Sequence, residues 1–283
     1  MAQQGWIARA RRWWRATPPL IRRCSIVLLI IGVLLAGAGL WLDHTNWWEG
    51  HSFFVNLISS LTSLCFGVPT ALLVLTHLGN AQADARRTRR AKDFAHAEIR
   101  EFQTALTRAF NVTSTAALVS EVSSLSRGLH RLRQLRDTDG SAAAAFLRDF
   151  NALLNLGRGP SPAYRQPTSW AALSADRWQW RRVETWHVRV ETQWRVLSNE
   201  VRPMAIDCGL PWLQRSPAAA AEQTMRRLLS EDRRNPWRGQ QEAPDNQEAI
   251  TAMGHFLNDL RVLCSTADTL AARYPSPVSS RTP

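Results

Sequence analysis

The chain has 283 residues, more than a typical single domain, which favours one membrane module plus one soluble domain. Its mean hydropathy of -0.25 is that of an ordinary soluble protein, but this average conceals two long apolar runs in an arginine-rich background. Of the net charge of +12, residues 1–93 carry +7 and residues 94–283 carry only +5. Because nucleic-acid-binding proteins usually cluster Lys and Arg on one face, this diluted excess argues against a nucleic-acid partner.

Two features of the composition indicate where the chain comes from. Lys92 is the only lysine, and this arginine bias, with many alanines, is typical of a GC-rich bacterial genome. The four cysteines match no disulfide framework and no zinc site, which predicts reduced thiols, as in a cytoplasmic domain. They are Cys24, Cys65, Cys208 and Cys264.

Residues 1–17 predict a basic amphipathic helix that lies in a membrane interface. The apolar side chains fall within about 120° of one another on a helical wheel: Trp6, Ile7, Ala10, Trp13 and Trp14. The opposite side carries Arg9, Arg11, Arg12 and Arg15. The prolines at 18 and 19 end this helix. A disordered arginine-rich tail is the alternative, since short helices need a membrane to stabilise them.

Residues 20–42 and 53–78 predict two transmembrane helices. The stretch 24–42 contains no charged residue, and at about 1.5 Å per residue it just crosses a hydrocarbon core of about 30 Å. The second run is longer, also lacks Asp, Glu, Lys and Arg, and would need some tilt. The prediction is therefore an all-α membrane protein with a two-helix transmembrane hairpin.

The charges around the two runs predict the orientation. Arginines precede the first run, a basic cluster follows the second, and the connecting loop 43–52 has Asp43 and Glu49 but no Lys or Arg. The positive-inside rule then places both termini in the cytoplasm and the loop outside a bacterial plasma (inner) membrane. The residues expected at the surface, where they would meet anionic lipid headgroups, are Trp6, Arg9, Arg11, Arg12, Trp13, Trp14, Arg15, Arg22, Arg23, Arg86, Arg87, Arg89, Arg90 and Lys92.

Two alternatives to the hairpin remain open. Ala36-Gly37-Ala38 resembles the cleavage site of a signal peptide, and both runs could be buried core helices of a soluble protein. The long basic leader weighs against the signal peptide, and the agreement between run length and flanking charge weighs against buried core helices.

Small and polar residues on the two runs predict helix packing. Gly32, Ala36 and Gly39 share one face of the first run, a pattern that lets helices approach closely. The second run carries a small, weakly polar stripe of Asn56, Ser60, Ser63 and Gly67. Packing is the preferred interpretation, because no ionisable residue lies in the stripe, and a polar pore is the alternative.

From residue 79 onward the apolar spacing predicts helices. Residues 79–157 form a juxtamembrane helical segment that can continue the second run, with a Ser/Thr-rich stretch from 111 to 126 as a weak point. A short helix is expected from Ser141 to Leu156. Three prolines make 158–168 a linker.

Residues 169–274 predict a cytoplasmic helical bundle, and 275–283 a disordered tail. The strongest helix is expected from Ser169 to Arg202, ended by Pro203, with one apolar stripe and a Glu191–Arg195 pair on the other side. The stripe consists of Val183, Trp186, Val190, Trp194, Leu197 and Val201. Another helix is expected from Ser216-Pro217 to about Arg234, and the last from Asp245, capped with Glu248, to about Tyr274.

No motif in the sequence indicates catalysis or a cofactor. Glu184 and His187, followed by Glu191, have the spacing of one half of a di-iron site, but such sites need two pairs and two further glutamates. Surface charge is the preferred interpretation. The sequence contains no zinc-protease, phosphate-loop or serine-hydrolase signature. We therefore expect no catalytic, cofactor or metal site, and lean away from an enzyme.

The leading hypothesis is a membrane-anchored helical module that acts as a scaffold or regulator and binds a protein partner or itself. Trp178 and Trp180 lie off the apolar stripe and are candidates for the partner surface, since Trp is enriched at interface hot spots. Two alternatives remain: an oligomeric pore or transport subunit lined by the polar stripe of the second run, and a membrane-surface enzyme without a recognisable motif.

Overall fold

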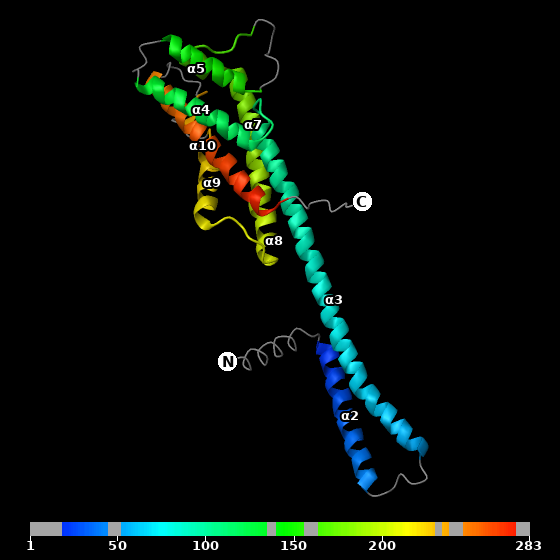
Figure 1. Ribbon diagram of the computed structural model, residues 1–283. Helices are drawn as coiled ribbons and strands as arrows, with labels where there is room; N and C mark the ends of the chain where they lie inside the picture. The colour runs from blue at the N-terminus through cyan, green and yellow to red at the C-terminus, as the bar shows by residue number, and fades with distance from the viewer. Residues whose placement is uncertain are drawn as a thin grey trace. The chain divides into compact units, whose positions relative to one another are not determined.

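A computed structural model of the protein describes residues 19–44, 52–134, 140–155, 164–229, 234–237 and 246–275. Every regular element within these ranges is a helix, which confirms the predicted all-α class for the described chain. The helices are α2 (Pro19–His44), α3 (Ser52–Thr107), α4 (Thr115–Gln134), α5 (Gly140–Leu153), α6 (Trp170–Ser174), α7 (Arg177–Val196), the π-helix η1 (Leu197–Val201), α8 (Arg202–Asp207), α9 (Arg215–Arg227) and α10 (Asn246–Arg273) (Figure 1).

The chain divides into two compact units, an N-terminal unit (Met1–Arg87) and a C-terminal unit (Thr88–Pro283). The N-terminal unit contains α2 and the first part of α3, and both are long and apolar enough to cross a membrane. Only 11% of the most apolar stretch of each helix is buried by the rest of the protein. Within the described residues, most of each apolar stretch is therefore not covered by protein.

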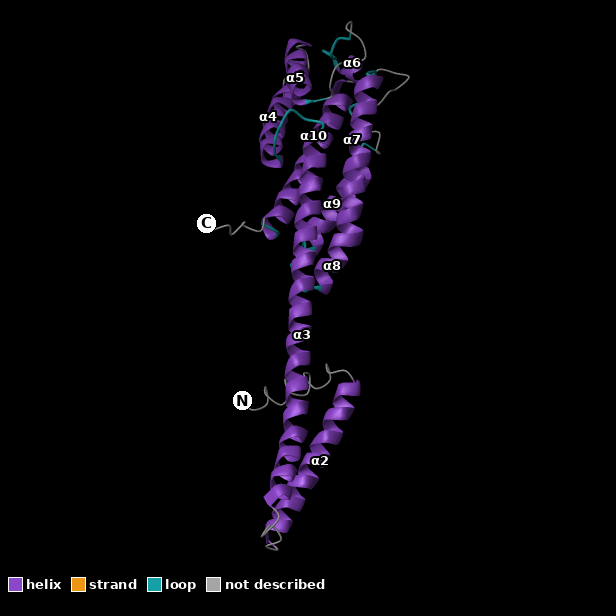
Figure 2. Ribbon diagram, turned by 90° about the vertical axis from the view of Figure 1, so that its right-hand side faces the viewer, coloured by secondary structure: helices purple, strands orange, loops and turns teal. Residues whose placement is uncertain are grey.

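Helix α2 contacts α3 through the glycine predicted to pack. A Cβ atom at Gly32 would lie 3.0 Å from the Cβ of Cys65 and 3.1 Å from the ring of Phe66. Gly32 and Cys65 are both buried, and Ser25, two turns earlier on α2, is buried too. Both views show α2 running beside this part of α3 (Figures 1 and 2). The absent side chain of Gly32 thus sets the close approach of the two helices.

Helix α3 continues without a break from the second apolar run, 53–78, into the segment that follows it, a point that the sequence left open. It has 56 residues, contains Pro69, and supplies its last part to the C-terminal unit. The hydroxyl of Thr70 donates to the carbonyl of Phe66 at 2.8 Å, one turn back and beside the carbonyl that Pro69 leaves without a donor. After Arg90 the buried positions follow helical spacing: Ala91, Ala95, Ile99, Phe102 and Leu106.

The C-terminal unit is built around α10. Six apolar residues at helical spacing along it are all fully buried: Ile250, Met253, Phe256, Leu257, Leu260 and Leu263. Helix α10 packs against α4, α9 and α6, and the ring of Phe256 meets the rings of Phe150, Trp186 and Trp237 edge-on. Residues on both sides of the predicted linker 158–168 share this single core, because α4 and α5 bury their apolar faces against the same centre as α7 and α10.

The prediction of a single helix from Ser169 to Arg202 is wrong in two places. The helix is broken near its start, where the carboxylate of Asp176 accepts from the amides of Trp178 and Gln179, each at 3.0 Å, and so begins α7. It is not ended by Pro203. The chain widens into η1, where the amide of Arg202 donates to the carbonyl of Leu197 five residues back, and Pro203 sits in the first turn of α8. The wider π-turn gives the ring of Pro203 more room than an α-helical turn, in which the ring would crowd the carbonyl four residues back.

Two other helix boundaries also differ from the prediction. Helix α9 starts at Arg215 after Gln214 and ends at Arg227, so Ser216 lies inside the helix and is not its cap. The weak stretch predicted from 111 to 126 is interrupted only before Thr115, where α4 begins. Its serines are tolerated because Ser123 and Ser126 donate to carbonyls one turn back, while Leu118, Val122 and Leu125 are buried.

The contact at Gly32 predicts a selective effect of adding a side chain there. In Gly32→Val the new methyl groups would push α2 away from Cys65, whereas a Cβ at Gly37 meets no atom within 4 Å. We expect a maleimide to modify Cys65 at least several-fold faster in purified full-length Gly32→Val than in wild type or in the control Gly37→Val, as read by peptide mass spectrometry. Equal rates in the two variants would contradict the helix contact.

Candidate functional site

The predicted membrane-surface residues lie partly outside the described chain. Trp6, Arg9, Arg11, Arg12, Trp13, Trp14 and Arg15 fall outside the described residues. Of the others, Arg22 is half-buried and Arg23 exposed on α2. The predicted basic residues on α3 are all exposed: Arg86, Arg87, Arg89, Arg90 and Lys92. At about 100° per residue these five surround the helix and form a basic collar on it.

The two sets of predicted packing residues differ in their contacts. Gly32 is buried against α3, and Ala36 and Gly39 on the same face are half-buried. In contrast, the stripe of α3 is exposed along its whole length: Asn56, Ser60, Ser63 and Gly67. A Cβ at Gly67 would meet no atom within 4 Å. The stripe therefore does not pack against α2 within this chain.

The two tryptophans proposed as a partner surface are half-buried against the core of the C-terminal unit. The ring of Trp178 lies 4.8 Å from that of Tyr164, centroid to centroid, and the guanidinium of Arg182 lies 5.8 Å from the Trp178 ring. Trp178 therefore already contacts both the Tyr164 ring and the Arg182 guanidinium, so less of its surface is open to a partner than the sequence suggested.

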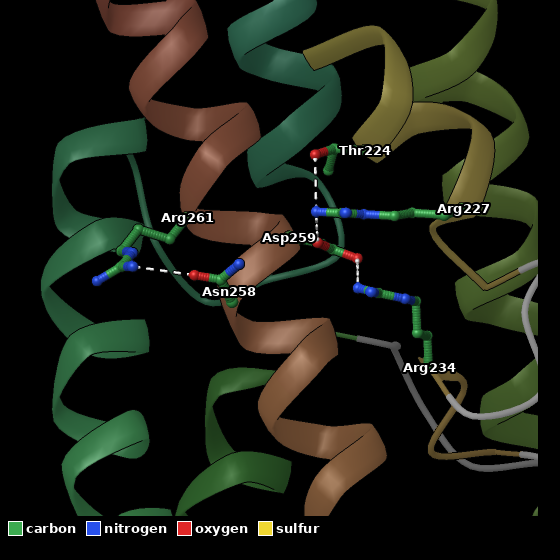
Figure 3. Close-up of polar contacts among 6 residues, drawn as sticks. All are labelled: Thr224, Arg227, Arg234, Asn258, Asp259 and Arg261. Carbon is green, nitrogen blue, oxygen red and sulfur yellow. Dashed lines mark hydrogen bonds and ion pairs between the residues drawn. The ribbon is translucent and has the colours of Figure 1, made fainter. Parts of the chain in front are cut away.

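A carboxylate is buried in the middle of α10. Asp259 has no exposed side-chain surface, and its Oδ1 accepts from Nη2 of Arg227 at 2.8 Å, while Oδ2 lies 3.7 Å from Nη1 of Arg234. Arg227 also reaches the hydroxyl of Thr224 at 3.4 Å. Figure 3 shows the two arginines converging on Asp259 from α9 and from the segment after it. Burial raises the pKa of Asp259, and the two arginines oppose that rise.

This ion-pair cluster ties three segments together. Arg227 ends α9, Arg234 lies in the described segment 234–237, and Asp259 belongs to α10. Sequence reasoning missed the cluster, although a signal existed. Asp259 follows Phe256 by three residues and precedes Leu263 by four, so a charged residue stands on the apolar face of its helix.

A second polar network lies in the same core. The amide nitrogen of Gln179 donates to the side-chain oxygen of Asn151 at 3.0 Å, and the indole N–H of Trp237 donates to the side-chain oxygen of Gln179 at 3.1 Å. Asn151 in turn donates to the carbonyl of Pro167 at 2.9 Å. These bonds join α5, α7 and segment 234–237, and satisfy amides that would be costly to bury alone.

The half di-iron pattern does not assemble a metal site in the described residues, where no group of three His, Cys, Asp or Glu side chains converges. Glu184 is exposed and Glu191 half-buried, with Nη2 of Arg195 at 2.7 Å from Glu191, as predicted. His187 is not a surface residue as expected. It is half-buried, its ring hydrogen-bonds the backbone of Met225, and burial lowers its pKa.

A groove of about 630 Å³ lies between α4 and α5. Leu125, Leu132, Phe146 and Leu153 are buried side chains that line it. Its ionisable lining residues are Glu121, Arg131 and Asp149, all exposed. The groove thus combines an apolar base with charges of both signs, a lining suited to an amphipathic segment of another protein.

Comparison with protein-family models, with curated proteins and with solved structures found no match. The candidate sites therefore rest on the geometry of this chain.

The neighbouring residues Arg226 and Arg227 provide a matched test of the buried cluster. Arg227→Met leaves Asp259 buried with only the more distant Arg234, and we expect it to lower the free energy of unfolding by about 3 kcal/mol. Arg226→Met removes an exposed arginine that pairs with Glu222 and should cost less than about 0.5 kcal/mol. Denaturant unfolding of the full-length protein, followed by circular dichroism, measures both values.

A compensating variant separates the charge effect from loss of packing. Asp259→Leu combined with Arg227→Met removes both charges and should recover most of the lost stability. Equal destabilisation by Arg226→Met and Arg227→Met would contradict the structural role of the cluster.

Proposed function

We propose that the protein is a multi-pass protein of the bacterial plasma (inner) membrane, with cytoplasmic termini, whose C-terminal unit is a helical scaffold or regulatory module that binds a protein partner or a second copy. The observation that carries the membrane anchor is the apolar surface of α2 and the first part of α3. The large side chains on it include Leu34, Leu40, Phe53 and Leu75, which are 66%, 74%, 71% and 65% exposed.

This surface is unfavourable in water. Burying one such side chain is worth about 1.5–3 kcal/mol, so leaving many of them hydrated would cost more than the whole stability of a typical domain. A lipid bilayer removes that cost without requiring any protein contact. Lipid also explains why exposed apolar side chains cover most of the circumference of both helices, since a helix that packs on one core needs only one apolar stripe.

The basic collar supports the cytoplasmic placement of the second helix end. The apolar run ends at Leu78, and a short stretch, 79–85, separates it from the collar. All five collar residues are exposed on α3: Arg86, Arg87, Arg89, Arg90 and Lys92. Cations at this position favour the cytoplasmic side and attract anionic headgroups, with each contributing on the order of 1 kcal/mol.

The groove between α4 and α5 supports the interaction role of the C-terminal unit. Its volume of about 630 Å³ lies within the range of binding pockets, and its apolar base would bury the hydrophobic face of a partner helix. Glu121, Arg131 and Asp149 at its edges would select that partner by charge.

An oligomeric pore or transport subunit is the second candidate, and one observation favours it. The stripe of Asn56, Ser60, Ser63 and Gly67 is exposed, so in lipid its polar groups would gain from facing a second copy or a pore. The scaffold proposal ranks first because residues 53–78 contain no Asp, Glu, Lys or Arg to bind an ion or a charged substrate.

Cysteine labelling of intact cells tests the anchor and its orientation. We expect Thr45→Cys, in the proposed external loop, to react with a membrane-impermeant maleimide in intact cells. The native Cys208, which is half-buried in the C-terminal unit, should react only after the cells are permeabilised. The protein should also remain in the pellet after an alkaline carbonate wash. Recovery in the supernatant, or labelling of Cys208 in intact cells, would contradict the proposed topology.

Site-specific photo-crosslinking tests the groove as a docking site. A photoreactive amino acid in place of Ser124, an exposed residue lining the groove, should give a discrete crosslinked product in native membranes. The same residue in place of Thr192, exposed on α7 and away from the groove, is the control. Mass spectrometry identifies the product as another protein or a second copy. Uncrosslinked protein at both positions, or the same products from both, would refute docking in this groove.

A further inference from the structure

A second cavity in the C-terminal unit has a different lining. It measures about 410 Å³ and lies where α7 meets the chain just after α3 and just after α5. Its lining residues are Arg108, Ala109, Asn155, Arg182, Thr185, Trp186, Val188 and Arg189. The three ionisable residues among them are all arginines, which stay protonated at any physiological pH.

The acidic residues of α7 lie away from this cavity. At about 100° per residue, Arg189 falls within about 20° of Arg182 around the helix, while Glu184 and Glu191 fall about 180–200° away. Glu191 is also engaged by Arg195 on that other face. Helix α7 therefore keeps its two carboxylates away from the cavity and lines it with two of its arginines, while Arg108 lines it from just after α3.

The backbone under the cavity is firmly held. The indole N–H of Trp186 donates to the carbonyls of Ala105 and Leu106 at 3.0 and 3.2 Å. The segments after α3 and α5 form a short antiparallel bridge, in which the amide of Asn155 donates to Ala109 and that of Asn111 to Leu153, each at 2.7 Å. The backbones of the three segments that line the cavity are thus positioned before any ligand binds, which lowers the entropic cost of binding.

We propose that this cavity binds a phosphate group carried by a small organic molecule. Guanidinium groups donate paired N–H bonds that match phosphate oxygens, and three arginines line this cavity. The volume exceeds what a phosphate alone would fill, and exposed Val188 with the buried Trp186 offers apolar surface for the remainder of the ligand. This site is separate from the groove between α4 and α5, so either can fail without the other.

Titration with pyrophosphate tests the site. Full-length protein in nanodiscs of phosphatidylcholine should bind pyrophosphate saturably, with one ligand per chain, by isothermal calorimetry. Arg189→Gln removes one charge-assisted contact and should raise Kd about ten-fold or more. Arg195→Gln, which makes the same charge change on a face of α7 outside the cavity, should leave Kd within about two-fold. Because both side chains are exposed, thermal melting should show that both variants are folded.

A second arm distinguishes a free phosphate compound from a lipid headgroup. In nanodiscs that contain phosphatidylglycerol, a headgroup ligand would compete and raise the Kd for pyrophosphate in Arg195→Gln but far less in Arg189→Gln. A free ligand would leave the ratio of the two Kd values unchanged. Both outcomes support the site. It is refuted if pyrophosphate shows no saturable binding at millimolar concentration, or if Arg189→Gln and Arg195→Gln bind with equal Kd.

Discussion

The apolar side chains in the last part of α3 pack against protein, whereas most of those in the first part do not. This difference in surroundings along one helix constrains the rest of the molecule. In its last part, Ala95, Ile99, Phe102 and Leu106 are buried in the core of the C-terminal unit. In its first part, only a narrow strip that includes Cys65 is covered, and large side chains elsewhere are exposed. One uninterrupted backbone carries both parts, so the same helix lies in a protein core at one end and, in the function proposed above, in a lipid bilayer at the other.

The core of the C-terminal unit gains its specificity from polar groups. Aromatic rings from α5, α7 and segment 234–237 gather around Phe256, and such contacts tolerate several arrangements. The Asp259 cluster and the Gln179–Asn151–Trp237 network do not, because any shift of the helices would leave a buried charge or amide without its partner. We interpret both networks as determinants of one packing arrangement.

The functional proposals follow from two surfaces with opposite character. The groove between α4 and α5 has an apolar base and mixed charges, whereas the cavity beside α7 has arginines as its ionisable residues. We proposed a protein segment as the ligand of the first and a phosphate as the ligand of the second. A module with both properties, tethered by two apolar helices, would bind its partner at the membrane and could respond to an anionic ligand there. Such regulation would require the groove and the cavity to lie on the same unit, and the residues that line both belong to the C-terminal unit.

Local sequence patterns determined the all-helical class, the two apolar runs, the buried faces of α7 and α10 and the Glu191–Arg195 pair, because hydrophobic period and short-range spacing act within one helix. Only the tertiary structure decided which distant groups meet. Asp259 finds Arg227 32 residues away, and Gln179 finds Trp237 58 residues away. Local reasoning also missed the helix break at Asp176 and the π-turn before Pro203. The free energies of a capped helix start, a continued helix and a widened turn differ by only about 1 kcal/mol or a few. Packing against the core therefore selects among them.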